Sequence, residues 1–112
     1  MSARLTSKVL VSSLLRRVQA EGGFGAVLAR GDATSGAILI VLAERGMRIA
    51  TLERLLQPDG AYAWQESGPP GADDEAFRSM LERRRRSDPD LWIVELDVAD
   101  AERFAAEMNA GG

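Results

Sequence analysis

Ser87-Asp88-Pro89-Asp90-Leu91-Trp92-Ile93-Val94-Glu95-Leu96-Asp97 is the stretch that decides the fold, because a charged helix must end in it and an apolar strand must begin. Pro89 lacks a backbone N–H and disfavours the α conformation at the residue before it, which stops the helix. The β-branched and aromatic residues that follow are typical of a buried strand. Since side chains alternate along a strand, Trp92, Val94 and Leu96 share one face, and we expect Trp92 to anchor the core.

Three helices are predicted: one before this strand in the sequence, one after it, and one at the N-terminus. Residues 73–86 begin with acids and end with Arg83-Arg84-Arg85-Arg86, an order that the helix macrodipole favours. Residues 6–21 carry apolar side chains three and four positions apart, before Gly22-Gly23 ends the helix. The last helix is expected to begin near Asp97, whose carboxylate can cap it.

Four further strands are predicted between the first two helices, at residues 24–30, 37–43, 47–52 and 62–65. Glu44-Arg45-Gly46 is interpreted as a hairpin connection. Residues 52–57 suit either a strand or a short helix, because their three leucines share a helical face. We favour the strand, since only about six residues precede the breaker Pro58-Asp59-Gly60.

Residues 37–43 are apolar on both faces of their strand, so the sheet needs cover on both sides. The order of elements predicts one α+β domain over residues 1–112, an antiparallel β-meander of about four to five strands with helices on one face. Such a sheet would leave edges and part of a face open, so a homodimer or a protein partner is expected. The competing prediction is a monomer with two helices on one face and the N-terminal helix on the other.

The 112-residue chain contains no Cys and no His, which excludes thiolate and imidazole catalysis and zinc sites built from those ligands. We expect no metal and no cofactor. Its 14 basic and 17 acidic residues give a net charge of −3 and a pI near 5.0, which disfavours nucleic-acid binding. The longest apolar run, residues 37–43, is too short to cross a bilayer, and no signal peptide is recognised. A cytoplasmic protein without membrane contact is therefore expected.

Two groups of residues are candidates for a small binding site. Arg30-Gly31-Asp32 with Gly36 suits either a backbone nest for an anion or a hairpin turn in which Asp32 binds neighbouring amides. Glu95 and Asp97 share a strand face, about 7 Å apart at Cα. That spacing suits a divalent cation or acid/base work, or simply a strand end that emerges into water. In both cases we favour the structural interpretation.

The arginine run is a third candidate, for nucleic-acid phosphates. Four consecutive residues point to all sides of a helix, so Arg83-Arg84-Arg85-Arg86 cannot form one basic stripe, and Arg84 is expected near the apolar face. We therefore favour a solvated helix end that complements the macrodipole.

Three pieces of the chain carry a family resemblance. They are Leu14-Leu15-Arg16-Arg17, the turn from Arg30-Gly31-Asp32 to Gly36-Ala37-Ile38, and Asp88-Pro89-Asp90-Leu91-Trp92-Ile93-Val94-Glu95. Together they resemble an uncharacterised bacterial family, the domain of unknown function 1491. The last piece is the most specific, because an acid-proline-acid before an alternating aromatic strand is infrequent. The resemblance implies a small bacterial cytoplasmic protein, mainly of alphaproteobacterial lineage, and implies no active site.

Gln65-Glu66-Ser67-Gly68-Pro69-Pro70-Gly71-Ala72 is loosely similar to the Q/R-x-x-G-x-G/A loop of the acetyl-coenzyme A dependent N-acetyltransferase superfamily. The second glycine comes one position late, and Pro69 and Pro70 remove two N–H donors that would hold a pyrophosphate. The sequence thus favours a small non-catalytic protein that binds itself or a protein partner. An enzyme of the acetyltransferase type, a carboxylate or divalent-cation site, and a weak nucleic-acid-binding module are the alternatives.

Overall fold

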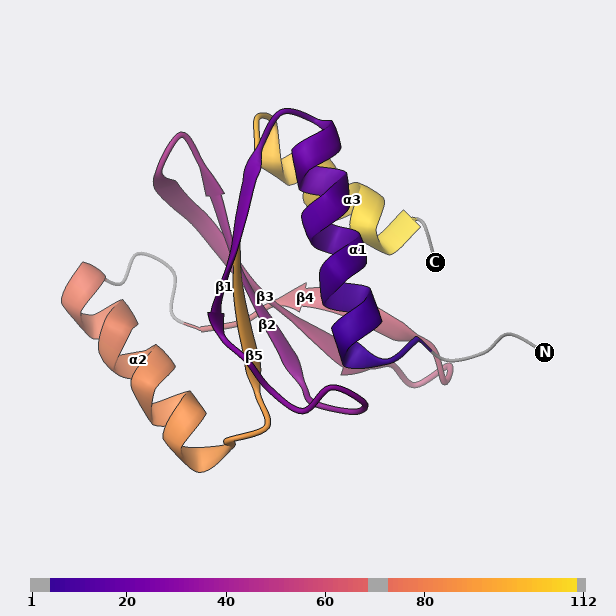
Figure 1. The fold of residues 1–112 in the computed structure, drawn as a ribbon, viewed down its shortest axis with the longest axis vertical. Helices are drawn as coiled ribbons and strands as arrows, with labels where there is room; N and C mark the ends of the chain where they lie inside the picture. The colour runs from indigo at the N-terminus through magenta and orange to yellow at the C-terminus, as the bar shows by residue number, and fades with distance from the viewer. Residues whose placement is uncertain (1–4, 69–72, 111–112) are drawn as a thin grey trace.

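The computed structural model describes residues 5–68 and 73–110, which form three helices and five strands (Figure 1). The elements are α1 (Ser7–Ala20), β1 (Phe24–Ala29), β2 (Ile38–Glu44), β3 (Met47–Leu56), β4 (Tyr62–Glu66), α2 (Asp74–Ser87), β5 (Trp92–Asp97) and α3 (Ala101–Ala110). Their order is the predicted one, and the ambiguous segment after residue 52 continues strand β3. Within these described ranges, no helix has both the length and the apolar character that a membrane crossing requires.

The five strands form one sheet in the order β1-β5-β2-β3-β4. Strand β5 runs parallel to β2, and every other neighbouring pair is antiparallel. The prediction of an antiparallel meander is therefore wrong in this respect, because the sheet is mixed. Helix α2 carries the chain from β4 back across the sheet, so that β5 enters between β1 and β2 with Val94 beside Ile40. Parallel strands require such a crossover.

Helices α1 and α3 cover one face of the sheet and α2 covers the other (Figure 1). The expectation that all helices lie on one face is wrong. On β2, Ile40 belongs to the main core under α1 and α3, whereas Leu39 and Val41 belong to a smaller core under α2. On β5, Val94 and Ile93 divide between the two cores in the same way. The doubly apolar strand thus receives cover on both faces from its own chain, and α2, rather than the N-terminal helix, is the helix that stands alone.

The hairpin between β2 and β3 is held by a residue at the far end of β5. Arg45 and Gly46 have φ values of 52° and 80°, as a tight two-residue hairpin turn requires. Their N–H groups donate to the Asp97 carboxylate at 2.9 and 2.7 Å. Asp97 therefore stabilises this turn. The prediction that Asp97 caps the last helix is wrong. Helix α3 begins later, at Ala101, whose N–H donates to the Glu44 carboxylate at 3.0 Å.

Helix α2 is attached to the sheet by few side chains. No residue within Asp74–Ser87 is fully buried, and Phe77 and Leu81 pack against the smaller core. Arg84 donates to both carboxylate oxygens of Glu53 on β3, at 3.1 and 2.5 Å. This bond to Arg84 holds the pKa of the Glu53 carboxyl below its ordinary value, against the opposing effect of burial. A bidentate ion pair is thus a principal tie between α2 and the sheet.

Replacing Trp92 tests the faces assigned to β5. The side chain is 2% exposed, and its indole N–H donates to the Asp32 carbonyl at 2.7 Å. Trp92→Ala should lower the free energy of unfolding by about 3–5 kcal/mol, because it opens a cavity in the main core. Trp92→Phe keeps most of the packing but loses the hydrogen bond, and should lower it by about 1–2 kcal/mol. Urea denaturation measures both effects, and an unmoved midpoint for Trp92→Ala would contradict the core position.

The Glu53–Arg84 pair should make stability depend on pH. Glu53→Gln should lower the free energy of unfolding at neutral pH by roughly 1 kcal/mol, since the pair is only partly buried. The pKa of Glu53 is lower in the folded than in the unfolded state. The difference in free energy of unfolding between wild type and variant is therefore fully present above pH 4.5, the ordinary pKa of a glutamate carboxyl. It is lost as the pH falls through the lowered pKa of Glu53.

Denaturation curves collected from neutral pH to about pH 3 measure this difference. Glu66→Gln, which removes an exposed carboxylate on the neighbouring strand, serves as the control. A destabilisation by Glu53→Gln that stays constant down to the lowest pH would contradict the assigned role of the pair.

Candidate functional site

The loop between β1 and β2 contains the predicted anion site, Arg30-Gly31-Asp32 with Gly36. The Asp32 carboxylate accepts from the backbone N–H groups of Ser35 at 2.8 Å and Thr34 at 3.2 Å. These two hydrogen bonds lower the pKa of Asp32. Because the loop satisfies these N–H groups with its own carboxylate, the geometry supports the turn interpretation over an anion nest.

The same loop packs against the start of β5 and the start of α1. The backbone oxygen of Asp90 lies so close to Gly31 and Gly36 that a Cβ atom on either glycine would overlap it. The Asp32 N–H donates to that same oxygen at 3.0 Å, and the Ser7 hydroxyl donates to the Gly36 carbonyl at 2.6 Å. The glycines are therefore required by close packing of two chain segments, and the motif stabilises the fold.

Glu95 and Asp97 lie on the face of β5 that α2 covers. Asp97 is occupied by the hairpin turn, and Glu95 is half-buried opposite Ala26 of β1. Among residues 5–68 and 73–110, no three acidic side chains gather so that they could hold a metal ion. The Asp97 carboxylate is thus occupied by hydrogen bonds to the turn, and Glu95 alone does not form a cation site.

The four consecutive arginines at the end of α2 diverge. Arg84 is paired with Glu53, and Arg85 donates at 3.0 and 2.7 Å to two backbone carbonyls, one just after β1 and one just before β5. Arg83 and Arg86 are exposed. Since two of the four guanidinium groups bind the sheet, the run gives no continuous basic strip of the kind that tracks a nucleic-acid backbone.

The loop that resembles the acetyltransferase motif leads into α2. Its residues 69–72 lie outside the part of the chain that the structure describes. At the start of α2, the Asp73 carboxylate accepts from the Ala76 N–H at 2.8 Å, so the cap residue already occupies one N–H group of that helix end.

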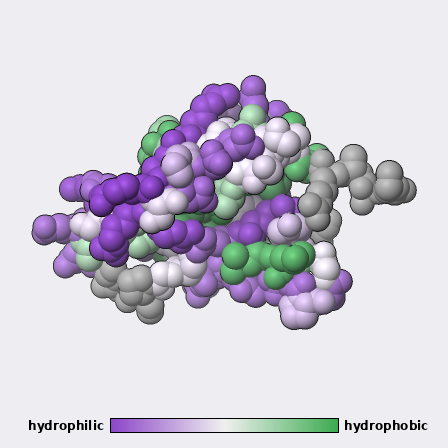
Figure 2. Space-filling view, turned by 90° about the horizontal axis from the view of Figure 1, so that it is seen from below, coloured by the Kyte–Doolittle hydropathy of each residue, from purple (hydrophilic) through white to green (hydrophobic). Residues whose placement is uncertain are grey.

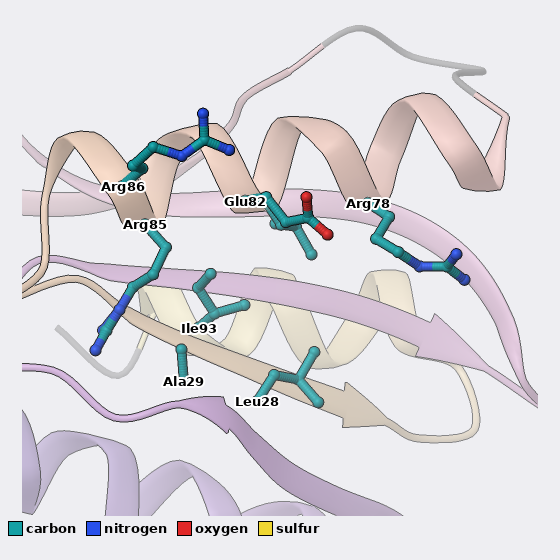
Figure 3. A pocket seen from close by; sticks show the side chains of 8 residues that line it. Leu28, Ala29, Arg78, Glu82, Arg85, Arg86 and Ile93 are labelled. Carbon is teal, nitrogen blue, oxygen red and sulfur yellow. The ribbon is translucent and has the colours of Figure 1, made fainter.

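An open groove, which we name the α2 groove, lies between α2 and the strands β1 and β5. It has a volume of about 510 Å³ and is lined by Leu28, Ala29, Arg78, Leu81, Glu82, Arg85, Arg86 and Ile93 (Figure 3). The strand residues form an apolar floor, and α2 places charged side chains above it. A second hollow of about 390 Å³ continues the groove along the sheet toward Glu95, and shares Leu28, Arg78 and Leu81 with it.

Leu28 is the functional candidate that sequence reasoning missed. It is the extra residue of a β-bulge, because Val27 pairs with Val94 and Ala29 pairs with Ile93. Its side chain is 53% exposed and lines both hollows. A large apolar side chain is thus exposed to solvent in a groove that Arg78, Arg85 and Arg86 also line.

The sequence does carry one signal for the groove. Four of the 14 residues of α2 are apolar, namely Ala76, Phe77, Met80 and Leu81. The side of the molecule on which α2 lies is correspondingly hydrophilic (Figure 2). A helix with so narrow an apolar stripe cannot alone cover one face of a five-stranded sheet.

Comparisons with solved structures agree with this fold. A crystal structure of a DUF1491 family protein from Caulobacter crescentus CB15, at 1.87 Å resolution, matches with a TM-score of 0.76 and 28% identity, over 88% of this chain and 92% of that one. An NMR structure of a DUF1491 family protein from the same organism matches with a TM-score of 0.75 and 28% identity, over 89% of this chain and 91% of that one. A solution structure of a protein from A. tumefaciens matches with a TM-score of 0.72 and 33% identity, over 88% of this chain and 89% of that one.

Comparisons at the level of sequence give the same family. A search of curated proteins finds no match. The family model described as "Protein of unknown function (DUF1491)" matches residues 5–106, which is most of the chain and includes all three pieces on which the resemblance rests. The chain therefore belongs to the DUF1491 family of proteins of unknown function.

Proposed function

We propose that the protein is a non-catalytic binding protein and that the α2 groove is its binding site. The ligand that fits has an apolar body, which lies on Leu28, and an anionic group, which reaches Arg78 and Arg86. The observation that carries this proposal is that the half-exposed side chain of Leu28 and arginines of α2 line the same groove (Figure 3).

Both parts of the groove favour such a ligand energetically. Covering the half-exposed side chain of Leu28 removes apolar surface from water and contributes roughly 1 kcal/mol. Arg78 and Arg86 are eight residues apart on α2, so they lie on the same side of the helix, with Glu82 between them. Guanidinium groups bind carboxylate, sulfonate or phosphate oxygens through two parallel N–H bonds.

The charge of the groove differs from that of the whole chain. Three arginines and one glutamate line the α2 groove, a local balance of +2, whereas the chain carries −3. A small cationic patch on an acidic protein attracts a ligand with one or two negative charges. The same overall charge repels a long polyanion, so this arrangement favours a compact acidic group over nucleic acid.

Binding is proposed rather than catalysis because of what the lining residues offer. They supply apolar surface and cationic charge, and the chain contains no His or Cys to act as a nucleophile or as a general base near neutral pH. A cytoplasmic location and a homodimer, both expected from the sequence, remain predictions. One argument for the dimer is weakened, because helices of the same chain cover both faces of the apolar strand β2.

The probe 1-anilinonaphthalene-8-sulfonate tests the proposed site, because it combines an aromatic body with one sulfonate. Its fluorescence should rise saturably with one site per chain, and the amide resonances of β1, β5 and α2 should shift. Leu28→Asp and the double variant Arg78→Gln/Arg86→Gln should each weaken binding at least about five-fold, a loss of roughly 1 kcal/mol.

Arg83→Gln is the matched control, since Arg83 is an exposed arginine on the same helix that does not line the groove. It should leave the affinity unchanged. Circular dichroism and the urea midpoint show whether each variant is folded. Equal binding by wild type and both groove variants, or shifts confined to α1 and α3, would contradict the proposal.

A further inference from the structure

We propose that the ligand of the α2 groove is an extended acidic segment of a partner protein, which adds to the sheet as a sixth strand beside β1. This inference rests on the proposed function and specifies the partner by its chemistry. The position of β1 at the edge of the sheet, directly beside the arginines of the groove, carries it.

Strand β1 presents an edge that carries no charge and no proline, two features that often prevent an edge from pairing; its sequence is Phe-Gly-Ala-Val-Leu-Ala. The bulge at Leu28 interrupts this edge, so its regular part runs from Phe24 to Val27. Every second residue of an edge strand directs its N–H and C=O groups outward. In residues 5–68 and 73–110, the backbone of Phe24–Ala29 hydrogen-bonds only within the sheet. The edge can therefore pair with another strand.

The opposite edge of the sheet is blocked at its middle residue. Strand β4 lies at that edge, and the Asn109 side chain from α3 binds both backbone groups of Trp64 there. The Trp64 N–H donates to Asn109 Oδ1 at 2.7 Å, and Asn109 Nδ2 donates to the Trp64 carbonyl at 3.0 Å. A side chain thus occupies the place of a neighbouring strand at Trp64, which makes β4 a poorer edge for strand addition than β1.

The two faces of β1 define the side chains of the added strand. On the α2 side the new strand runs beside Leu28, under Arg78 and Arg86, which favours acidic residues at every second position. On the α1 side it runs beside Val27, which is 42% exposed, and near Leu15, which packs against Gly25. That side favours apolar residues. The expected partner is a segment in which apolar and acidic residues alternate.

A second copy of this chain fits the edge less well. Antiparallel pairing of β1 with its own copy would need a two-fold axis perpendicular to the sheet, which places both α2 helices on the same side. The arginines of the two grooves would then face each other across the new strand pair, and like charges in juxtaposition oppose association. Charge complementarity therefore favours an acidic partner over self-association.

Blocked eight-residue peptides test this proposal with the full chain. The first alternates valine and glutamate, and should bind with a Kd on the order of 10–100 µM by NMR titration. The second alternates valine and lysine, and should bind at least about ten-fold more weakly. When the first peptide is bound, outward-facing amides of β1 should become protected from hydrogen exchange.

Backbone methylation distinguishes strand addition from simple occupation of the groove. One valine-glutamate peptide carries N-methyl groups on all its valines and another carries them on all its glutamates. N–H groups of alternate residues point to opposite edges of a strand, so only one of the two peptides can lose its bonds to β1. We expect one methylated peptide to lose affinity at least about ten-fold and the other to keep it.

Charge reversal tests the arginines independently of the peptide backbone. The double variant Arg78→Glu/Arg86→Glu should prefer the lysine peptide over the glutamate peptide, whereas Arg83→Glu should keep the wild-type preference.

Full affinity of both methylated peptides, with sulfonate binding intact, would overturn strand addition but leave the groove as a binding site. If the wild-type protein bound neither the sulfonate probe nor any of the peptides, both proposals would be overturned. Protection of β1 by a concentration-dependent dimer in the absence of peptide would assign the edge to a second copy and overturn the acidic partner.

Discussion

Strands β2 and β5 form a parallel pair that is apolar on both faces, and the rest of the structure follows from the need to cover it. Ile40 and Val94 pack under α1 and α3, while Leu39 and Ile93 pack under α2. A parallel pair has to be joined by a crossover, and the helix in that crossover supplies cover for the second face. The central position of β5 then moves β1 to the edge of the sheet, separated from β2, its neighbour in sequence.

The cover on the two faces is unequal. Helices α1 and α3 bury a large core, whereas α2 contains no fully buried residue. It is attached through two apolar side chains, ion pairs to Glu53 and Arg48 of β3, the contact of Arg48 with the Phe77 ring, and the hydrogen bonds of Arg85. Part of the sheet beside β1 therefore stays open, with Leu28 on its floor and arginines above. One face of the fold is thus closed, and the other stays partly open beside β1.

The elements themselves were predictable, because proline, glycine and the alternation of side chains act locally. Trp92 was correctly placed in the core for that reason. The order of strands was not predictable, since no local pattern says that β5 enters between β1 and β2. Contacts across long stretches of sequence were also missed: Asp97 binds a hairpin turn 51 residues away, and Glu53 pairs with Arg84, 31 residues away. The groove depends on both the strand order and the narrow apolar stripe of α2, so it could be recognised only in the structure.

Native-state hydrogen exchange on the dilute protein, resolved residue by residue, tests the central claim of an unequally closed fold most directly. In such a fold, amides of β2, β5, α1 and α3 should exchange only through global unfolding. Amides of α2 should exchange through local opening at a much lower free energy, and the outward amides of β1 should be nearly unprotected. If α2 and every amide of β1 were protected as strongly as β5, both sides of the sheet would be fully closed, which would contradict an unequally closed fold.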